Sequence, residues 1–340
     1  MITEFLKTTE DLYRQSIVKS AEILRKGGIV AIPTETVYGL AASALDSDAL
    51  KKVFEAKGRP QDNPLIVHIS NMEMLREIAK DIPEKARLCA EKFWPGPFTM
   101  VLPSSGKVDK RVSAGLDTVA VRMPNHKIAL DIIDESGLPL AAPSANTSGS
   151  PSPTSAEHVK ADLNGKIDAI VFGDECSVGV ESTVVSFCTN PPRLLRPGAV
   201  TAEHLTEIIG DLIVDKAVLA EPEKGQKIES PGMKYKHYAP RADVYLIEGK
   251  SEDFIDYVNS KGDGIAVCFS EEADKITVSK LVYGIGADES TLAHEVFSVL
   301  RKIDNLGQEK AYIHAPSKTG VGLAVYNRLI RAAAYKVVQL

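Results

Sequence analysis

The sequence predicts an α/β fold in two domains: a mixed, twisted sheet with helices against it, then a smaller Rossmann-like parallel α/β domain. Three observations support this. The chain has 340 residues, 44% of them hydrophobic, which is enough for two cores. Apolar strands and amphipathic helices mingle without strict alternation up to about Asp215, and alternate regularly after residue 241. A polar segment rich in Gly and Pro, residues 221–241, separates the two patterns.

The first elements follow from apolar periodicity and stop signals. A helix is expected at about 10–26, because Ile17, Ala21 and Leu24 share one face and two glycines follow. A buried strand at 29–33 is followed by a helix that begins at Asp46 or Ser47. The next strand is expected at 65–69.

Later elements are predicted in the same way. Before the linker we expect helices at 72–79, 84–93, 127–135, near 155 and at 201–209, and strands at 98–102, 119–123, 139–142, 182–187 and 194–195. After it we expect strands at 244–247, 265–269, 281–285 and 312–315, and helices at 252–259, 291–304 and 323–335. The predicted division is therefore a first domain at 1–214, a linker at 215–241 and a second domain at 242–340.

Composition limits the classes of function. A net charge of −6 argues against a protein coated in positive charge for nucleic acid, although a local basic cleft stays open. The four cysteines are far apart in the sequence and form no zinc or redox motif, so we expect reduced, packed thiols in a cytoplasmic protein. The acidic N-terminus lacks the apolar run of a signal peptide, and we find no span of 18 apolar residues for a membrane helix.

The first group of candidate site residues follows the helix at 47–57. Lys57 lies on the same apolar stripe as Val53 and Phe54, and Gly58, Arg59 and Asn63 come after it. One interpretation is a solvated helix end, where cations favour the helix dipole. The other is an anion site, because Lys and Arg bind phosphate or carboxylate and Arg does so with two parallel hydrogen bonds. The residue types leave both open.

The second group is Ser144, Asn146 and Ser152. A flexible Ser/Pro linker is one interpretation of this tract. However, the tract follows an apolar strand and precedes a helix, and in such a loop small residues allow backbone N–H groups to approach phosphate oxygens. No P-loop motif occurs, and Gly320-Val321-Gly322 lacks the third glycine of a dinucleotide fingerprint, so a tight turn explains it better.

Several single residues also need an explanation. Arg122 interrupts an apolar strand, where a buried charge needs either a structural partner or an anionic ligand. His68 lies within another strand, and by itself a satisfied core histidine is the simpler interpretation. Arg196 ends a short strand, and Glu181-Ser182-Thr183 opens one. Near the N-terminus, Thr34-Glu35-Thr36 follows directly after an apolar strand.

Taken together, these motifs resemble one family. The paired signature is Lys57-x-Arg59 with Ser144-x-Asn146, and it is accompanied by Pro33-Thr34-Glu35-Thr36-Val37-Tyr38-Gly39-Leu40, Asn63-Pro64-Leu65, Trp94-Pro95-Gly96-Pro97, Leu195-Arg196-Pro197-Gly198 and Ser230-Pro231-Gly232-Met233-Lys234-Tyr235. The chain resembles the YrdC-like family, and within it the threonylcarbamoyl-AMP synthases of the long, two-domain type. The resemblance covers nearly the whole chain and implies a YrdC-like fold for the first domain.

The resemblance also implies a reaction. L-threonine, bicarbonate (or CO2) and ATP would give L-threonylcarbamoyladenylate and pyrophosphate, which is the chemistry of a nucleotidyltransferase. A downstream complex would transfer the threonylcarbamoyl group to an adenosine beside the anticodon of tRNA. Mg²⁺ is expected on the triphosphate, held largely by phosphates and water, so no protein metal motif is required. Direct affinity for tRNA stays open.

Site residues are carried over from the family position by position. The resemblance implies threonine contacts from Thr36, His68, Arg122, Ala142 and Ser182. It implies ATP contacts from Lys57, Arg59, Asn63, Thr118, Ser144, Asn146, Ser152, Arg196 and Tyr235, with Lys57 and Arg59 as the catalytic pair. Because Tyr235 lies between the domains, we hypothesise that residues 221–241 fold over the site as a lid.

Two other functions remain as alternatives. One is the carbamoyltransferase module of hydrogenase-maturation proteins, which carry zinc-finger cysteine pairs before the module; this chain starts directly with the module. The other is an RNA-binding or ribosome-associated protein, against which the acidic composition counts. The sequence does not indicate the task of the second domain, the oligomeric state, the order of substrate binding or a general base.

Overall fold

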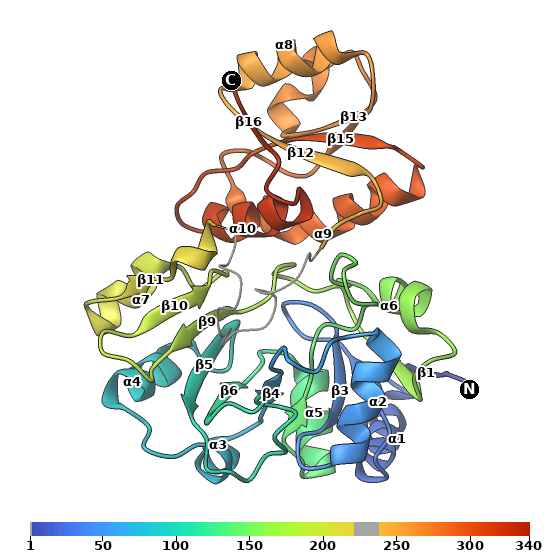
Figure 1. Ribbon diagram of the computed structural model, residues 1–340. Coiled ribbons are helices and arrows are strands. Elements are labelled where there is room, and N and C mark those ends of the chain that lie inside the picture. The colour runs from blue at the N-terminus through green and yellow to red at the C-terminus, as the bar shows by residue number, and fades with distance from the viewer. Residues whose placement is uncertain (1, 221–237) are drawn as a thin grey trace.

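The computed structural model describes residues 2–220 and 238–340, and these form two sheets (Figure 1). The first sheet has the strand order β1-β8-β2-β3-β7-β4-β6-β5-β9-β10-β11, and the second has the order β14-β13-β15-β12-β16. Parallel pairs such as β4·β6 and β5·β9 occur in the first sheet beside antiparallel pairs such as β2·β3 and β5·β6. All pairs in the second sheet are parallel. The predicted fold class is confirmed.

The first unit contains the strands β1 (Glu4–Lys7), β2 (Val30–Ile32), β3 (Gly39–Ser43), β4 (Ile66–His68), β5 (Phe98–Pro103), β6 (Thr118–Arg122), β7 (Leu140–Ala141), β8 (Ala169–Phe172), β9 (Thr183–Ser186), β10 (Arg193–Arg196) and β11 (Ile213–Val214). Its helices are α1 (Tyr13–Arg25), α2 (Ser47–Lys57), α3 (Met72–Ile78), α4 (Glu84–Phe93), α5 (Lys127–Ser136), α6 (Ala156–Leu163), α7 (Ala202–Ile209) and the 3₁₀ helix η1 (Lys216–Val218).

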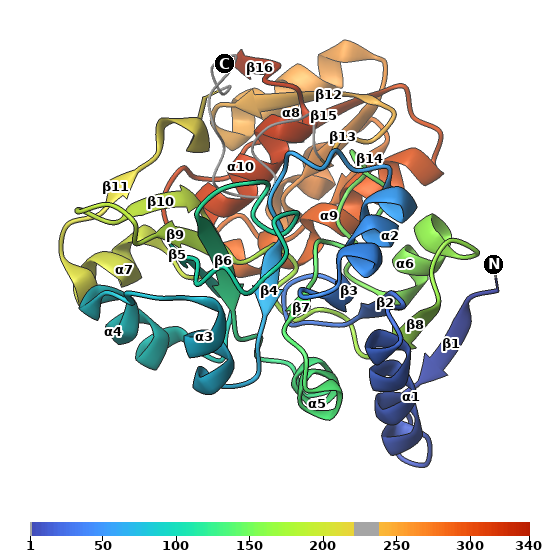
Figure 2. The same ribbon diagram turned by 60° about the horizontal axis from the view of Figure 1, so that its bottom comes forward.

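The second unit contains the strands β12 (Asp243–Glu248), β13 (Ile265–Cys268), β14 (Lys280–Val282), β15 (Lys310–His314) and β16 (Val337–Gln339). Its helices are α8 (Ser251–Lys261), η2 (Ser270–Lys275), α9 (Glu289–Asn305) and α10 (Gly322–Ala332). In Figures 1 and 2, α9 and α10 lie on the side of the second sheet that faces the first unit, whereas α8 covers the other side.

Local sequence explains the helix that carries Lys57. Asp46 caps α2 by accepting hydrogen bonds from the N–H groups of Asp48 and Ala49, and Gly58 ends the helix in the left-handed conformation with φ +60°. Lys57 is buried on the same side as Val53 and Phe54, as its position on the apolar stripe predicted. The geometry of this helix therefore places a lysine side chain in the interior.

Five strands were not predicted from the sequence: β1, β3, β8, β11 and β16. The most important is β3, whose sequence GLAAS was not predicted to be a strand. All five of its residues are buried, so it shows no alternation, and its small residues have little intrinsic preference for a strand. Pairing with β2 and β7 makes it a strand, which is a tertiary effect.

The two units share a core. Val37 and Val180, from loops of the first unit, belong to the hydrophobic cluster formed by α9, α10 and the second sheet. Next to Val180, Gly179 has φ +81°, and a Cβ there would lie 2.5 Å from the carbonyl oxygen of Ala293 and 2.6 Å from that of His294 in α9. The backbone of the first unit thus approaches α9 as closely as a glycine allows.

Three expectations need comment. Cys89, Cys176 and Cys268 are buried as predicted, but Cys188 is exposed, so the prediction of four packed thiols was wrong for that residue. No helix within the described ranges is long and apolar enough to cross a membrane. Tyr235 and most of the predicted lid at 221–241 lie outside the described residues.

Gly179→Ala should reduce the free energy of unfolding by about 3 kcal/mol, because strain at positive φ adds to a clash with α9. The matched control is Gly262→Ala: Gly262 has φ +69°, but no described atom lies within 4 Å of the position that its Cβ would take. In that variant the free energy of unfolding should fall by only about 1 kcal/mol. Urea unfolding of both variants measures the difference, and equal losses would contradict the close contact between the two units.

Candidate active site

One pocket brings together side chains from several strands and loops of the first unit and from Tyr238. Ten of its lining residues were predicted site residues: Thr36, Lys57, Arg59, His68, Arg122, Ala142, Ser144, Asn146, Ser182 and Arg196. The remaining lining residues are Thr34, Val37, Gly39, Leu65, Ile66, Pro143, Ser148, Gly149, Ser150, Glu181 and Tyr238. Residues far apart in the sequence therefore surround one cavity.

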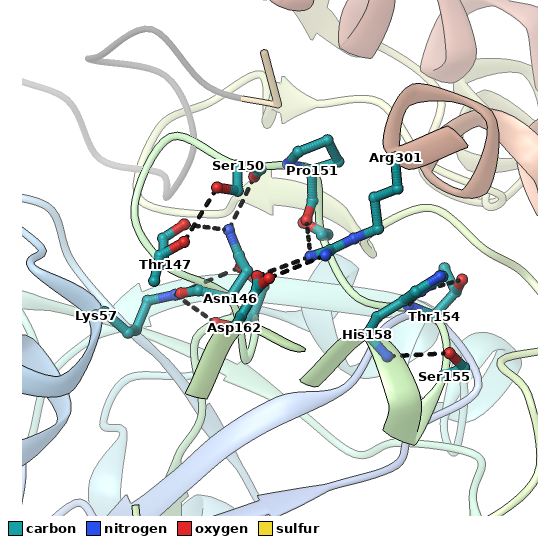
Figure 3. Close-up of polar contacts among 12 residues, drawn as sticks. Lys57, Asn146, Thr147, Ser150, Pro151, Thr154, Ser155, His158, Asp162 and Arg301 are labelled. Carbon is teal, nitrogen blue, oxygen red and sulfur yellow. Dashed lines mark hydrogen bonds and ion pairs between the residues drawn. The ribbon is translucent and has the colours of Figure 1, made fainter. Parts of the chain in front are cut away.

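Lys57 connects helix α2 to the loop after β7 (Figure 3). Its Nζ donates to the carbonyl oxygens of Ser144 and Asn146, the latter at 2.6 Å, and lies 3.5 Å from Oδ1 of Asn146. In return, the N–H of Ser148 donates to the carbonyl oxygen of Lys57 at 2.8 Å. The two halves of the paired signature, Lys57-x-Arg59 and Ser144-x-Asn146, are thus in direct contact.

Opposing influences act on the charge of Lys57. Burial lowers the pKa of Lys57 well below its ordinary value, and Arg59 lowers it further, whereas Asp162 and Glu181 oppose the shift. Three oxygen atoms nevertheless surround Nζ, which matches the three donors of an ammonium. An anion in the pocket would favour the charged form.

Arg59 organises the loop that precedes β4. Its guanidinium donates to the carbonyl oxygens of Asn63 at 3.4 Å and Pro64 at 3.2 Å. Asn63 itself is buried, and neither its amide oxygen nor its amide nitrogen has a hydrogen-bond partner among the described residues. A buried amide without partners is costly unless a ligand or water completes it.

Another residue of the pocket lining, Arg122 on β6, lies among oxygen atoms. It donates to Oγ1 of Thr36 at 2.7 Å and to the carbonyl oxygen of Gly96 at 3.2 Å. Its Nη2 lies 2.6 Å from a carboxylate oxygen of Glu35, and both side chains are buried. The charge that interrupted the apolar strand is thus paired structurally, and Arg122 also lines the cavity. Of the two explanations for a buried charge at Arg122, the structural partner is confirmed, and binding of an anionic ligand stays a prediction.

His68 lies beside Arg122, because β4 and β6 are parallel neighbours and these two residues are in register. Burial, together with the charge of Arg122, lowers the pKa of His68 to about 3. The ring is therefore neutral near pH 7, and its Nδ1 has no hydrogen-bond partner in the described part of the chain. This uncharged ring in the pocket wall can accept or donate a hydrogen bond.

Ser182 and Arg196 also line the pocket and are bonded to each other. Arg196 donates from Nε to the carbonyl oxygen of Ser182 at 3.0 Å and from Nη2 to its hydroxyl at 3.2 Å, and that hydroxyl lies 2.7 Å from Oγ1 of Thr99. Burial lowers the pKa of Arg196 to about 10, although Glu181 opposes this shift. Arg196 therefore stays charged at neutral pH.

Glu181 was not among the predicted site residues, although the sequence analysis noted it at the start of a strand. It lines the pocket and accepts a hydrogen bond from Oγ of Ser152 at 2.6 Å. Its other carboxylate oxygen accepts from Nε of Arg328 at 2.8 Å. Burial by itself would raise the pKa of Glu181, but Arg328 and Arg196 hold it below the ordinary value. In the sequence, Glu181 before Ser182 was only a weak indication of a site residue, because its partner Arg328 lies 147 positions away.

Not every predicted residue lines the pocket. Asn63, Thr118 and Ser152 are absent from the lining, and Tyr235 lies outside the described residues. Ser152 is buried and reaches the pocket through Glu181. Thr118 begins β6, at the end of the strand opposite to Arg122. These four predictions of direct contact stay predictions.

Comparisons with known proteins identify the family. A family model described as telomere recombination, which covers Sua5, YciO and YrdC proteins, matches residues 22–198, and a model described as the C-terminal domain of threonylcarbamoyl-AMP synthase matches residues 200–334. The threonylcarbamoyl-AMP synthase of Pyrococcus abyssi is 44% identical, with 100% of each chain covered. The one from Bacillus subtilis is 44% identical, with 98% of each chain covered.

The chain belongs to the threonylcarbamoyl-AMP synthase family. A crystal structure of P. abyssi Sua5 complexed with L-threonine has a TM-score of 0.90 to this chain at 43% identity, and the match covers all of both chains. Because this synthase family is matched over both sheets, the resemblance noted in the motifs extends to the whole architecture.

No cluster of three or more His, Cys, Asp or Glu side chains that could hold a metal ion occurs among the described residues. The buried acids near the pocket already bind arginines: Glu35 pairs with Arg122 and Glu181 with Arg328.

The pKa of His68 predicts how stability depends on pH. Below pH 6.5 the unfolded chain binds a proton at His68 that the folded chain does not bind until about pH 3. The free energy of unfolding should therefore fall as the pH decreases, by about 1.4 kcal/mol per pH unit from this group between pH 6 and 4. In His68→Asn the free energy of unfolding should decline less steeply than in the wild type, by about 1.4 kcal/mol per pH unit. Urea unfolding of both proteins at pH 4, 5 and 6 measures these slopes. Equal slopes in the wild type and the variant would contradict a buried neutral histidine.

Proposed function

We propose that this protein is an L-threonylcarbamoyladenylate synthase, a nucleotidyltransferase that forms threonylcarbamoyl-AMP and pyrophosphate from L-threonine, bicarbonate or CO2, and ATP. The observation that carries the proposal is the pocket itself, which gathers Lys57, Arg59, Arg122 and Arg196 around hydroxyl groups. A site with several cations suits a substrate with a carboxylate and a triphosphate. The names of the full-length relatives and the L-threonine in the P. abyssi crystal structure support the same reaction.

In this proposal threonine occupies the end of the pocket formed by Thr36, His68, Arg122, Ala142 and Ser182. Arg122 would bind the α-carboxylate through its guanidinium, which Glu35 and Thr36 already hold in place. His68, next to Arg122, is neutral and would contact the amino acid without adding a second positive charge beside Arg122. The nitrogen of the threonine amino group forms a bond to the carbon of CO2 and loses a proton to solvent, and the resulting carbamate carries the reacting oxygen.

ATP occupies the other end, along Lys57, Arg59, Ser144, Asn146 and Arg196, with Asn63, Thr118, Ser152 and Tyr235 as further predicted contacts. The carbamate oxygen attacks the α-phosphorus, a new P–O bond forms, and the bond to the bridging oxygen breaks as pyrophosphate leaves. Negative charge accumulates on the phosphate oxygens, so fixed cations and N–H donors suffice without a protein nucleophile. Lys57 and Arg59 are the proposed catalytic pair.

Mg²⁺ would enter with ATP, coordinated by phosphate oxygens and water. The product is a mixed anhydride that has to be consumed by an acyl transfer. We infer that a downstream complex in the cytoplasm transfers the threonylcarbamoyl group to a tRNA adenosine beside the anticodon. Tight binding of tRNA by this chain is not needed for the proposal.

Release of pyrophosphate from Mg·ATP tests the function. The synthase should require both L-threonine and bicarbonate, and adenylate formation should be visible as a product with the mass of threonylcarbamoyl-AMP. RNA affinity without turnover would favour the alternative of an RNA-binding or ribosome-associated protein. Transfer of a carbamoyl group from carbamoyl phosphate would favour the carbamoyltransferase alternative.

Lys57→Ala and Arg59→Ala should each reduce kcat/KM for pyrophosphate release by about 100-fold, because each removes a cation near the developing phosphate charge. Lys51→Ala is the matched control: Lys51 lies on the same helix, and its ion pair with Glu55 is exposed to solvent. Its kinetics should equal those of the wild type. Unchanged kinetics in either test variant would remove that residue from the catalytic pair.

Arg122→Lys should raise KM for threonine by about 10- to 100-fold, because lysine keeps the charge but loses the planar fork that binds a carboxylate through two hydrogen bonds. KM for ATP should change much less. Arg193→Lys is a control on the same sheet, at a partly exposed pair with Asp215. Steady-state kinetics with each substrate varied separately measures both constants. A change confined to ATP would contradict the orientation proposed for the two substrates.

A further inference from the structure

The loop between β7 and α6, residues 142–155, forms much of the proposed ATP end of the pocket, and it is contacted from outside by the second unit. Arg301 on α9 donates from Nη2 to the carbonyl oxygen of Pro151 at 2.6 Å (Figure 3). Its two Nη atoms also bind the two carboxylate oxygens of Asp162 on α6, at 3.0 and 2.9 Å. The side chains of Arg301 and Asp162 are both only 13% exposed. Arg301 thereby fixes the loop end relative to the helix that follows it.

The same loop is folded onto itself and onto Lys57. The amide nitrogen of Asn146 donates to the carbonyl oxygens of Thr147 and Ser150, each at 2.8 Å, and the hydroxyls of Thr147 and Ser150 lie 3.1 Å apart (Figure 3). Since Lys57 donates to the carbonyl of Asn146, a shift of the loop at Pro151 would be transmitted to the Nζ of Lys57.

A second arginine of the second unit reaches the pocket wall. Arg328 on α10 is fully buried and donates to the Oε2 of Glu181 at 2.8 Å, the carbonyl oxygen of Glu181 at 3.1 Å and that of Pro197 at 2.8 Å. The other carboxylate oxygen of Glu181 holds Ser152, one residue beyond Pro151. Arg301 and Arg328 therefore act on neighbouring residues of one loop, from two different helices.

The second unit is fixed against the first at several further points. Val37 and Val180 belong to its core, and Gly179 lies against the backbone of α9. On α10, Asn327 donates to the carbonyl oxygen of Val218 at 2.6 Å, and Arg331 donates to that of Ala217 at 2.8 Å. Helices held by this many contacts provide a rigid base for the two arginines.

We propose that Arg301 and Arg328 are positioning residues for ATP, and that the second domain serves the reaction by holding the loop at 142–155 against Lys57. The inference rests on the proposed function for its substrate and deepens it by giving the second domain a task. Phosphate contacts made through a loop rich in Ser, Gly and Pro depend on where that loop is held, and a displacement of about 1 Å can cost 100-fold in rate.

The test compares Arg301→Gln, Arg301→Lys and Arg328→Lys in the full-length chain with a matched control, Lys310→Gln. Lys310 belongs to the second unit and forms an exposed pair with Asp263. For Arg301→Gln we expect Kd and KM for Mg·ATP to rise about tenfold while KM for threonine changes less than twofold. Arg301→Lys should recover part of the loss, because it keeps the charge but not the fork. Lys310→Gln should match the wild type.

Hydrogen exchange gives a readout independent of turnover. In Arg301→Gln the amide of Ser148, which donates to the carbonyl oxygen of Lys57, should exchange faster, with no change in the strands of either sheet. Arg328→Lys should show the same change and the same increase in Kd for ATP. If it does not fold, the two Arg301 variants decide the question.

Wild-type Kd and KM for ATP in a folded Arg301→Gln would overturn the proposal, as would a lowered Tm without any change in the ATP constants. Failure of the proposed function is a separate result. In that case the wild-type protein releases no pyrophosphate with threonine and bicarbonate, while calorimetric binding of ATP still compares the variants.

Discussion

The buried ion pair between Glu181 and Arg328 joins the two domains at the wall of the pocket, and much of the site depends on it. A carboxylate inside a protein is costly unless it is paired and hydrogen-bonded, and Glu181 satisfies this with Arg328 on one oxygen and Ser152 on the other. Removing one partner of such a pair typically costs about 3–5 kcal/mol. The second domain is therefore part of the electrostatic balance of the site.

The same requirement explains the rest of the pocket. Lys57, Arg122 and Arg196 are also buried, and each is surrounded by oxygen atoms: two carbonyls for Lys57, Glu35 and Thr36 for Arg122, and Ser182 for Arg196. These partners keep the cations oriented before a substrate arrives. In the proposed reaction, such a prearranged site would need little reorganisation when negative charge develops on the phosphate, and this is a general source of electrostatic catalysis.

Apolar packing supplies the rigidity that these polar contacts need. Val37 lines the pocket and at the same time belongs to the core of the second domain, so one side chain connects the pocket with the packing of α9 and α10. Gly179 allows the backbones to approach closely where Arg301 contacts Pro151 of the loop at 142–155 and Arg328 contacts Glu181, which accepts a hydrogen bond from Ser152 of that loop. The backbone contact at Gly179, the shared apolar core and the arginine ion pairs thus all lie where the second domain meets the pocket.

The sequence by itself determined the fold class, the helix that buries Lys57 and most elements, because caps, stop signals and apolar periodicity act over a few residues. Motifs also pointed to ten residues that line the pocket. Only the tertiary structure decided that GLAAS is a strand, that Glu181 belongs to the site, and that Arg301 and Arg328 support it. Each of these depends on a partner elsewhere in the fold, 147 positions away for Glu181 and Arg328, and such distant pairings leave no local pattern in the sequence.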